Sequence, residues 1–415
     1  MKVKKYVRYQ LKSWLSLMIA FATIVFAMTV IVGLNASPSV VASPLESSEG
    51  GFATFNSASL PLPLYSYSRL PSSSIAEMLI PSLLAACILP FFAFGHRYGK
   101  VRADCYLSLP TKDGQVTRIR VLILGAFLLV TYLGSYLFGI GAAIARQFIT
   151  VASLSAKASQ AGNVVLTIVY GSFGWYFVAW IFGLFVVAGF YALNCFFVSQ
   201  GNNVIQGLIG LLSGNIVVNL FTVLSICLLI RFSASSDWYT DFGLNRLFIL
   251  SPGVYVPVYM MESIFGMLEI HAADAAESVY ADWPCWLSFA SFLVLAVGSA
   301  FYLLRGKEPG GESAGADRPR NPFAIALPHL AAGVLFSFNS ILFSVLFVTS
   351  SSFSYQYISF LVFVAALVWG GGIYYVVLSL YNRNFKLNLP NWISFAAILT
   401  GSFVLFLSTN LVPLY

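Results

Sequence analysis

The chain has 415 residues, of which 59% are hydrophobic and only 9% are charged. Because soluble domains carry about 25% charged residues, this composition excludes an ordinary soluble globule. The net charge of +7 comes from short basic clusters between apolar runs. No basic stripe is interleaved with aromatic residues, so the sequence does not indicate a nucleic-acid-binding protein.

Nine uncharged runs are each at least 17 residues long, enough to cross about 30 Å of hydrocarbon. They comprise residues 14–34, 78–94, 121–145, 164–198, 204–230, 283–304, 323–348, 358–380 and 392–411. We therefore predict an all-α polytopic membrane protein with about nine transmembrane helices. The fourth run has 35 residues, so we expect its helix to be tilted, to protrude or to break near Gly183 or Gly189. The first run resembles a signal sequence, and its 21 residues favour an uncleaved anchor.

The positions of the basic residues indicate the orientation, because cytoplasmic loops of membrane proteins collect Lys and Arg. With the N-terminus in the cytoplasm, 17 of the 22 basic side chains fall in inside segments and 5 fall outside. The short turn at residues 200–203 carries no charge and gives no indication. We predict a multi-pass plasma-membrane protein with a cytoplasmic N-terminus and an extracellular C-terminus.

Two predicted outside segments are long. Residues 35–75 are rich in Ser and Pro, and we expect an irregular surface loop there. Residues 233–282 have acidic ends and hold 15 uncharged residues at 247–261, too few for a crossing. We expect a re-entrant or interfacial hairpin that forms an outer lid. A pair of amphipathic helices packed on the bundle is the equal alternative.

The predicted inside loop at residues 96–120 combines basic side chains with an apolar group. That group consists of Tyr106, Leu107, Leu109 and Pro110. Pro110 cannot continue a helix, so a short helix ends before it, and Thr111 can cap a second helix that leads into the third run. Left in water, the apolar group would be an exposed patch. We therefore expect it to lie on lipid headgroups or to fit a groove on a partner protein.

Residues for several kinds of chemistry are missing from the sequence. No G-x-x-x-x-G-K-[ST] phosphate-binding loop occurs, so we expect no nucleotide hydrolysis by this chain. The histidines His96, His271 and His329 lie in separate segments, and the five cysteines lack metal-ligand spacing. We expect no metal site, no cofactor of its own, and a hydrogen-bonded His329. Glu77, at the edge of the second run, is expected to be interfacial, so we do not predict an enzyme.

Amide side chains occur inside the apolar runs. Asn194 lies in the fourth run, and Asn215 and Asn219 lie one turn apart on one face of the fifth. Gly210 and Gly214 form a small-xxx-small pair beside them, which allows a neighbouring helix to approach closely. We expect interhelical hydrogen bonds here, with contact to a substrate as the alternative.

The loop at 96–120 also carries a recognisable motif. Arg102-x-Asp104, then Tyr106 and Ser108-Leu109-Pro110, resembles the R-x-D-x-Y-x-S-L-P motif of ABC transporter permeases of the type 2 exporter class. Such permeases are common in Gram-positive bacteria next to antimicrobial-peptide exporters. Two other segments are similar to that family, namely Leu250-Ser251-Pro252 and the stretch with Tyr302, Arg305 and Glu308.

The resemblance implies a six-helix exporter core at residues 1–304, a cytoplasmic linker at 305–322 and three additional helices at 323–415. It implies that the loop 96–120 is a coupling helix for a separate ABC ATPase subunit, which would bind ATP and Mg. The coupling residues would be Arg102, Tyr106, Leu107, Ser108, Leu109 and Pro110. The outer gate would be Leu250, Ser251 and Pro252. The permease would pair with a second copy or a paralogue.

These features together predict the membrane-spanning permease of an ATP-driven exporter for an amphipathic substrate, a peptide antibiotic or a lipid. We expect ATPase subunits and membrane lipid as partners, and no nucleic acid. The alternative is a non-transporting sensor or scaffold whose extracellular hairpin binds a ligand. A third class, a lipid-modifying membrane enzyme, would require a buried acid or base.

Overall fold

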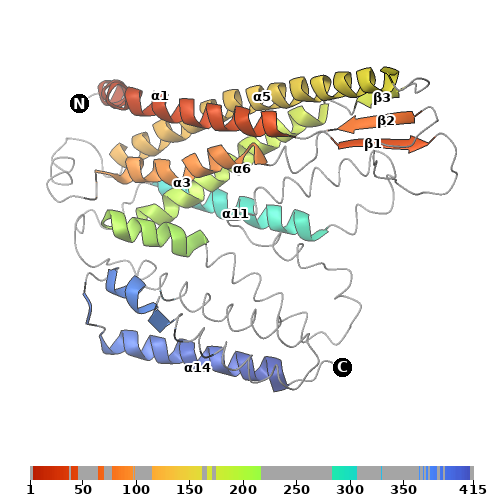
Figure 1. The fold of residues 1–415 in the computed structure, drawn as a ribbon. Coiled ribbons are helices and arrows are strands. Elements are labelled where there is room, and N and C mark those ends of the chain that lie inside the picture. Colours follow the sequence, from red (N-terminus) through yellow and green to blue (C-terminus); the bar gives the residue numbers. More distant parts are fainter. Residues whose placement is uncertain are drawn as a thin grey trace.

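The structure is a computed structural model of the chain, shown in Figure 1. It describes residues 3–36, 39–44, 64–69, 77–96, 98, 115–160, 166–170, 174–215, 283–305, 329, 364, 368, 371, 372, 374–380, 384–386 and 388–411. The helices among them are α1 (Val3–Asn35), α3 (Ile80–Phe94), α5 (Gln115–Gln160), α6 (Gly174–Ser199), Val204–Asn215, α11 (Trp283–Arg305) and α14 (Leu389–Leu411). The strands among them are β1 (Ser39–Pro44), β2 (Leu64–Arg69) and β3 (Leu166–Tyr170).

Several of the described helices have the length and apolarity of membrane spans. Three of them are long enough to cross, namely Tyr6–Asn35, Gln115–Thr150 and Tyr176–Ser199. Four shorter helical segments are also apolar, namely Ile80–Phe94, Val204–Asn215, Phe292–Arg305 and Leu389–Thr400. On α1, Leu15 and Ile19 are 56% and 58% exposed. Because such apolar faces suit hydrocarbon rather than water, this part of the chain has the character of a helical membrane protein.

Helices lie where the sequence predicts them. Five predicted runs, 14–34, 78–94, 121–145, 283–304 and 392–411, coincide with or fall within α1, α3, α5, α11 and α14 to within two residues. The run 204–230 is described as far as residue 215 and is helical there. In the runs 323–348 and 358–380 the structure describes only separate positions and one short helical stretch. The total of nine crossings therefore stays a prediction.

Helices α1 and α5 lie side by side and run in the same direction. Near the start of both, the Arg120 guanidinium lies 4.7 Å from the centre of the Trp14 ring. Further along, Gly33 meets Gly139 so closely that a Cβ added to Gly33 would lie 2.3 Å from the Gly139 carbonyl oxygen. Contacts at both points define a parallel pair, which agrees with the prediction that these helices are the first and third crossings.

Helix α6 runs in the opposite direction to α5. The Tyr191 hydroxyl, late in α6, donates to the Val121 carbonyl, early in α5, at 3.0 Å. The Tyr132 hydroxyl, later in α5, donates to the Trp180 carbonyl, early in α6, at 2.9 Å. The chain thus reverses between these helices, which agrees with the prediction that they are the third and fourth crossings. We call the end of the bundle where α3 ends and α5 begins the loop end, and the opposite end the sheet end.

The fourth apolar run is not one long helix, which corrects the expectation of a tilted, protruding or broken one. Its first part forms β3, and α6 begins only at Gly174. Helix α6 continues through Gly183 and Gly189 without a break. Both glycines instead allow side chains of neighbouring helices to pack closely against α6. A Cβ added at Gly183 would lie 2.2 Å from the Tyr132 hydroxyl oxygen, and one added at Gly189 would lie 2.9 Å from the Phe292 ring.

The small sheet corrects the expectation of an irregular loop at 35–75, because residues 39–44 and 64–69 form strands. It adds three short strands to a described structure that is otherwise helical. Strand β1 pairs with β2 in antiparallel fashion, with Ser39 opposite Arg69, and β2 pairs with β3 in parallel, with Leu64 opposite Leu166. Figure 1 shows this sheet beyond the end of α1, with α5 running past the bundle to reach it. The sheet therefore joins the connection after α1 to the connection between α5 and α6.

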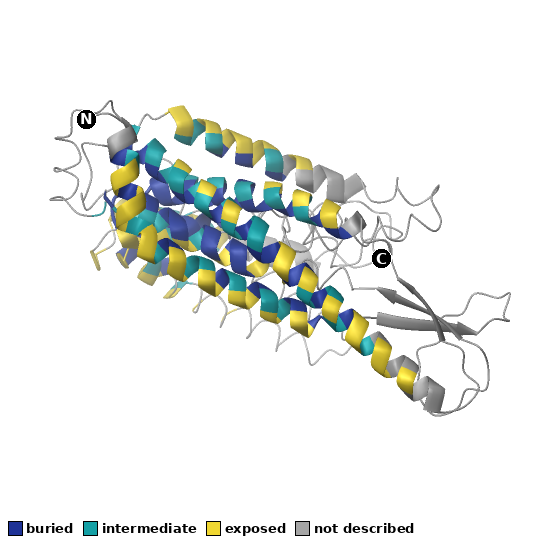
Figure 2. Cartoon of the chain, turned by 90° about the horizontal axis from the view of Figure 1, so that it is seen from above, coloured by how far each residue is buried: buried dark blue, intermediate teal, exposed yellow. Residues whose placement is uncertain are grey.

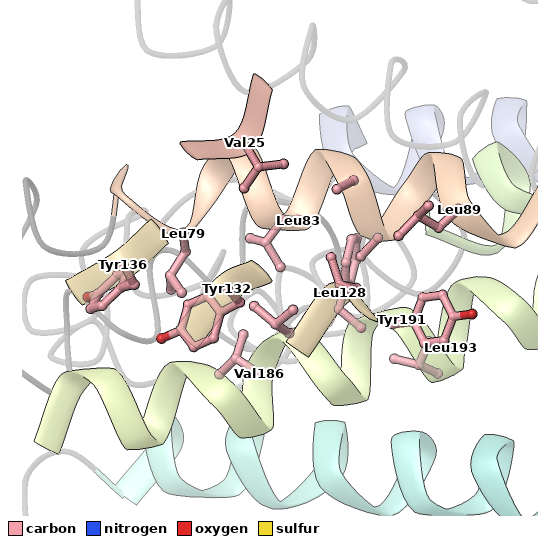
Figure 3. Close-up of a cluster of buried hydrophobic side chains, with 14 of the residues drawn as sticks. Val25, Leu79, Leu83, Leu89, Leu128, Tyr132, Tyr136, Val186, Tyr191 and Leu193 are labelled. Carbon is pink, nitrogen blue, oxygen red and sulfur yellow. The ribbon is translucent and has the colours of Figure 1, made fainter. Parts of the chain in front are cut away.

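The core lies where α1, α3, α5 and α6 face one another, and Figure 2 shows buried residues along these inner faces. Figure 3 shows side chains from this cluster gathered between the helices, with Tyr132 between Leu79 and Val186 and Tyr136 next to Tyr132. Both tyrosine rings are fully buried, and their centroids are 5.2 Å apart. This packing joins the four helices into one body.

Candidate functional site

The candidate site is the loop end, where α3 and α5 flank the predicted coupling loop. Residues 99–114 lie outside the described part of the chain, and so do the predicted coupling residues Arg102, Tyr106, Leu107, Ser108, Leu109 and Pro110. Asn219 and the predicted gate residues Leu250, Ser251 and Pro252 also lie outside it. The described residues show how the two helices that carry the loop are held.

Helices α3 and α5 are joined directly at the loop end. The buried Arg120 donates through Nη2 to the Phe92 carbonyl at 2.9 Å, and its guanidinium also lies over Trp14 of α1. A cation at the last turn of α3 is favourable because the final carbonyls of a helix lack intrahelical donors and carry partial negative charge. Arg120 therefore connects the end of α3, the start of α5 and α1.

His96 makes a second connection between the same two helices. Its Nδ1 lies 3.2 Å from the Ala93 carbonyl oxygen, and its Nε2 lies 3.2 Å from the Thr117 hydroxyl oxygen. A carbonyl oxygen only accepts, so Nδ1 carries the proton, and in the neutral ring Nε2 accepts from Thr117. The ring bridges the end of α3 and the first turn of α5. No pattern in the sequence predicts this role for His96.

All three arginines of α5 donate to the last turn of another helix. Besides Arg120, Arg118 donates through Nη2 to the carbonyl of Arg305, the last residue of α11. Near the sheet end, Arg146 donates through Nη1 to the Leu34 carbonyl of α1. We call Arg118, Arg120 and Arg146 the arginine clips. They fasten α5 to α11, α3 and α1, respectively, and in the sequence they indicate only the orientation of the chain.

Two of the three predicted amide residues, Asn194 and Asn215, come together. Asn215 donates through Nδ2 to the Asn194 side-chain oxygen at 3.1 Å, so α6 and helix Val204–Asn215 share a buried hydrogen bond. Asn194 in turn donates through Nδ2 to the Ala86 carbonyl of α3 at 3.3 Å. The same nitrogen lies 3.5 Å from Cys87 Sγ. Asn194 thus joins three helices.

The Ala86 carbonyl is open to Asn194 because of Pro90, four residues further along α3. Proline has no backbone N–H, so the carbonyl one turn before it loses its helical donor. In hydrocarbon no water replaces that donor, and an unsatisfied carbonyl is costly. Asn194 supplies the missing hydrogen bond, which explains how a proline persists inside a buried apolar helix.

The glycine pair Gly210 and Gly214 permits close packing, as the sequence predicts. A Cβ added at Gly210 would lie 2.9 Å from the Phe197 carbonyl oxygen, and one added at Gly214 would lie 2.5 Å from the Phe197 ring. Helix Val204–Asn215 therefore lies against α6 with Phe197 filling the contact. This approach brings Asn215 within reach of Asn194.

The uncharged turn between these two helices is buried and self-capped. Asn203 Oδ1 accepts from the Gln206 backbone N–H at 2.9 Å, and Gln206 Oε1 accepts from the Asn202 backbone N–H at 2.9 Å. This is a variant of the capping box, in which amide side chains satisfy the first N–H groups of a helix. A Cβ added at Gly207 would lie 2.8 Å from the Tyr98 hydroxyl oxygen, so Tyr98, at the start of the predicted coupling loop, packs against this helix. The N-x-x-Q spacing at 203–206 is the sequence pattern from which this helix cap could have been predicted.

Several chemically reactive side chains lie away from the loop-end contacts. His329 is hydrogen-bonded, as expected, because its Nδ1 lies 2.8 Å from the Tyr374 hydroxyl oxygen. Tyr374 also donates to the Asn391 carbonyl at 3.3 Å and so connects the stretch 374–380 to α14. Glu77 is exposed and precedes α3 at the sheet end. Cys87 and Cys195 are free thiols.

The chain matches no protein-family model, and neither a curated protein nor a solved structure matches it. The class of protein that its described residues define is therefore a helical membrane protein, and its function is argued from the site.

Proposed function

We propose that the chain is the membrane-spanning permease subunit of an ATP-driven ABC exporter, energised by a separate ATPase subunit. The observation that supports it most is the double connection of α3 to α5 on either side of the loop with the R-x-D-x-Y-x-S-L-P residues. Arg120 to Phe92 and His96 to Thr117 hold the two helix ends together. Because the two helix ends are joined, a partner protein that displaces the loop between them would move α3 and α5 together.

In this proposal the loop end faces the cytoplasm, and the apolar residues Tyr106, Leu107, Leu109 and Pro110 dock in a groove of the ATPase. The loop has the chemistry for such docking, because an apolar group next to basic residues suits a partner groove. ATP and Mg bind to the partner. Closure of the ATPase displaces the loop, and the fastened ends of α3 and α5 move as one rigid body.

Helix α5 carries this displacement toward the sheet end. It is a continuous helix of 46 residues and contacts both β2 and β3. A straight helix transmits a shift at one end to the other, since its hydrogen bonds resist compression. The proposed pathway for the amphipathic substrate, a peptide antibiotic or a lipid, opens along the second and fifth predicted spans. Opening there separates the contacts that Asn194 makes with Ala86 and Asn215.

The test is a substitution in the loop. Leu109→Asp places a charge in the docking group, so we expect the variant to insert in the membrane but to lose co-purification with the ATPase. Thr111→Asp is the matched control, because it adds the same charge two residues away and keeps a good helix cap. Affinity purification in mild detergent with identification of companion chains gives the readout. Unchanged ATPase recovery with Leu109→Asp would remove the coupling assignment.

A second candidate, a non-transporting sensor or scaffold, is favoured by the small sheet at the end of α5. In that function a ligand bound at the sheet end would move α5, and the loop end would pass the signal to a cytosolic partner. The same purification separates the two candidates. A Walker-type ATPase among the companions supports transport, whereas a kinase or regulator supports sensing.

A further inference from the structure

The corner where α5 begins and α11 ends carries two guanidinium groups. Arg118, in the first turn of α5, donates to the backbone carbonyl of Arg305, and the exposed Arg305 guanidinium lies 4.6 Å from the centre of its own helix's Phe301 ring. The first N–H groups of α5 add partial positive charge at this level. The described residues of this corner therefore contribute positive charge.

No carboxylate among the described residues balances this charge. The described part of the chain contains a single acidic residue, Glu77, and it lies at the sheet end. Arg118 Nε is buried and has no hydrogen-bond partner within the described residues. A buried charged donor without an acceptor is unfavourable, so among the described residues Arg118 Nε still requires an acceptor, which an anion would supply.

The surroundings of the corner indicate which anion fits. One turn from Arg118, Leu122 is 56% exposed, and one turn before Arg305, Phe301 is 58% exposed. These apolar side chains lie toward the middle of the membrane from the two arginines. A phospholipid fits both the arginines and the apolar side chains, because its phosphate would lie at the level of the arginines and its acyl chains beside Leu122 and Phe301.

We propose that Arg118 and Arg305 bind the phosphate of an anionic phospholipid at the corner where α5 begins and α11 ends. Arginine suits this role because its planar fork pairs with phosphate oxygens, and the Arg118 fork is already oriented by its bond to the Arg305 carbonyl. The lipid fastens α11 to α5 beside the loop. This site requires that α5 and α11 lie in a bilayer, but it does not require an ATPase.

The experiment uses the full purified chain in neutral detergent and measures the rise of its melting temperature with added phosphatidylglycerol. In Arg118→Gln/Arg305→Gln we expect the phosphatidylglycerol concentration for half the rise to increase about tenfold, because charge-assisted bonds to phosphate are lost. The matched control, Arg8→Gln/Lys12→Gln, removes the same charge from exposed positions of α1 at the loop end and is expected to respond like the parent chain.

Two further arms identify the occupant. Inorganic phosphate and phosphatidylcholine at the same concentrations are expected to give a much smaller rise. An equal rise with inorganic phosphate would overturn the lipid and assign the corner to a free anion. If both double variants lost the phosphatidylglycerol response equally, the lipid would be attracted by overall charge and the proposed site would be refuted. Arg305→Gln alone keeps the backbone contact to Arg118, so an unchanged response in this variant would also contradict the proposal.

Discussion

At the residue scale, Asn194 shows how one polar side chain replaces what the backbone of another helix lacks. Its side-chain N–H reaches the carbonyl that Pro90 leaves without a donor, and its oxygen accepts from Asn215. Hydrogen bonds between membrane helices are worth about 0.6 kcal/mol on average and up to about 1.7. Asn194 is expected to exceed the average because its loss exposes two unsatisfied groups at once.

We expect Asn194→Leu to lower the free energy of unfolding by about 1–3 kcal/mol, measured by titration with a denaturing detergent. Pro90→Ala restores a backbone N–H for the Ala86 carbonyl, so the same substitution should cost less in that background. Thr23→Val is the control, since the Thr23 hydroxyl bonds only to its own helix at an exposed position. An equal loss in both backgrounds would show that the bond to Ala86 contributes nothing.

At the element scale, the parallel pair of α1 and α5 depends on a glycine crossing. Gly33 and Gly139 allow the two backbones to touch, while Gly141, two residues further along α5, has open space around its Cβ position. Alanine is intrinsically better than glycine in a helix by about 1 kcal/mol. The space around the Cβ position therefore decides whether a glycine-to-alanine substitution stabilises or destabilises the protein.

Gly33→Ala is expected to destabilise the protein by about 1–3 kcal/mol, because its Cβ would overlap the Gly139 carbonyl and push α1 away from α5. Gly141→Ala, with the same chemistry, is expected to be neutral or slightly stabilising. Thermal unfolding followed by light scattering or a thiol-reactive dye compares the pair. Equal melting temperatures for the two variants would refute the close crossing.

At the scale of the whole molecule, the direction of the chain divides it into two ends. Figure 1 shows α1 beginning and α14 ending at opposite ends of the bundle, and the sheet lies at the end where α14 ends. The basic side chains of the sequence are concentrated in segments assigned to the loop end. The proposed orientation therefore places the loop end in the cytoplasm and the sheet end outside.

This orientation predicts one-sided labelling with a membrane-impermeant thiol reagent. In a chain whose native cysteines are replaced by serine, Ala156→Cys, exposed on the far part of α5, should react in intact cells. Arg8→Cys, exposed near the start of α1, should react only after the membrane is opened. The reverse pattern would invert the orientation and place the coupling loop outside the cell.

The sequence predicted what depends on local pattern and not what depends on distant pairing. Apolar length located α3 and α11 to within two residues, and the amides and glycines of the fifth run were recognised as a contact surface. The sheet was missed because β3 lies inside an apolar run that continues into α6, and a strand is defined by its partner. The arginine clips were missed because a sequence shows an arginine at a helix end but not the carbonyl it reaches.

The spacing of the arginine clips has a consequence for the lipid around the protein. Arg120 and Arg146 are about 26 residues apart, roughly 39 Å along a helix at 1.5 Å per residue, close to the full thickness of an ordinary bilayer with its headgroups. A lone helix answers hydrophobic mismatch by leaning. Here α5 is fastened to α1, α3 and α11, so α5 cannot tilt in the bilayer without the other three helices. In a thin bilayer it is then the lipids next to the protein that must stretch.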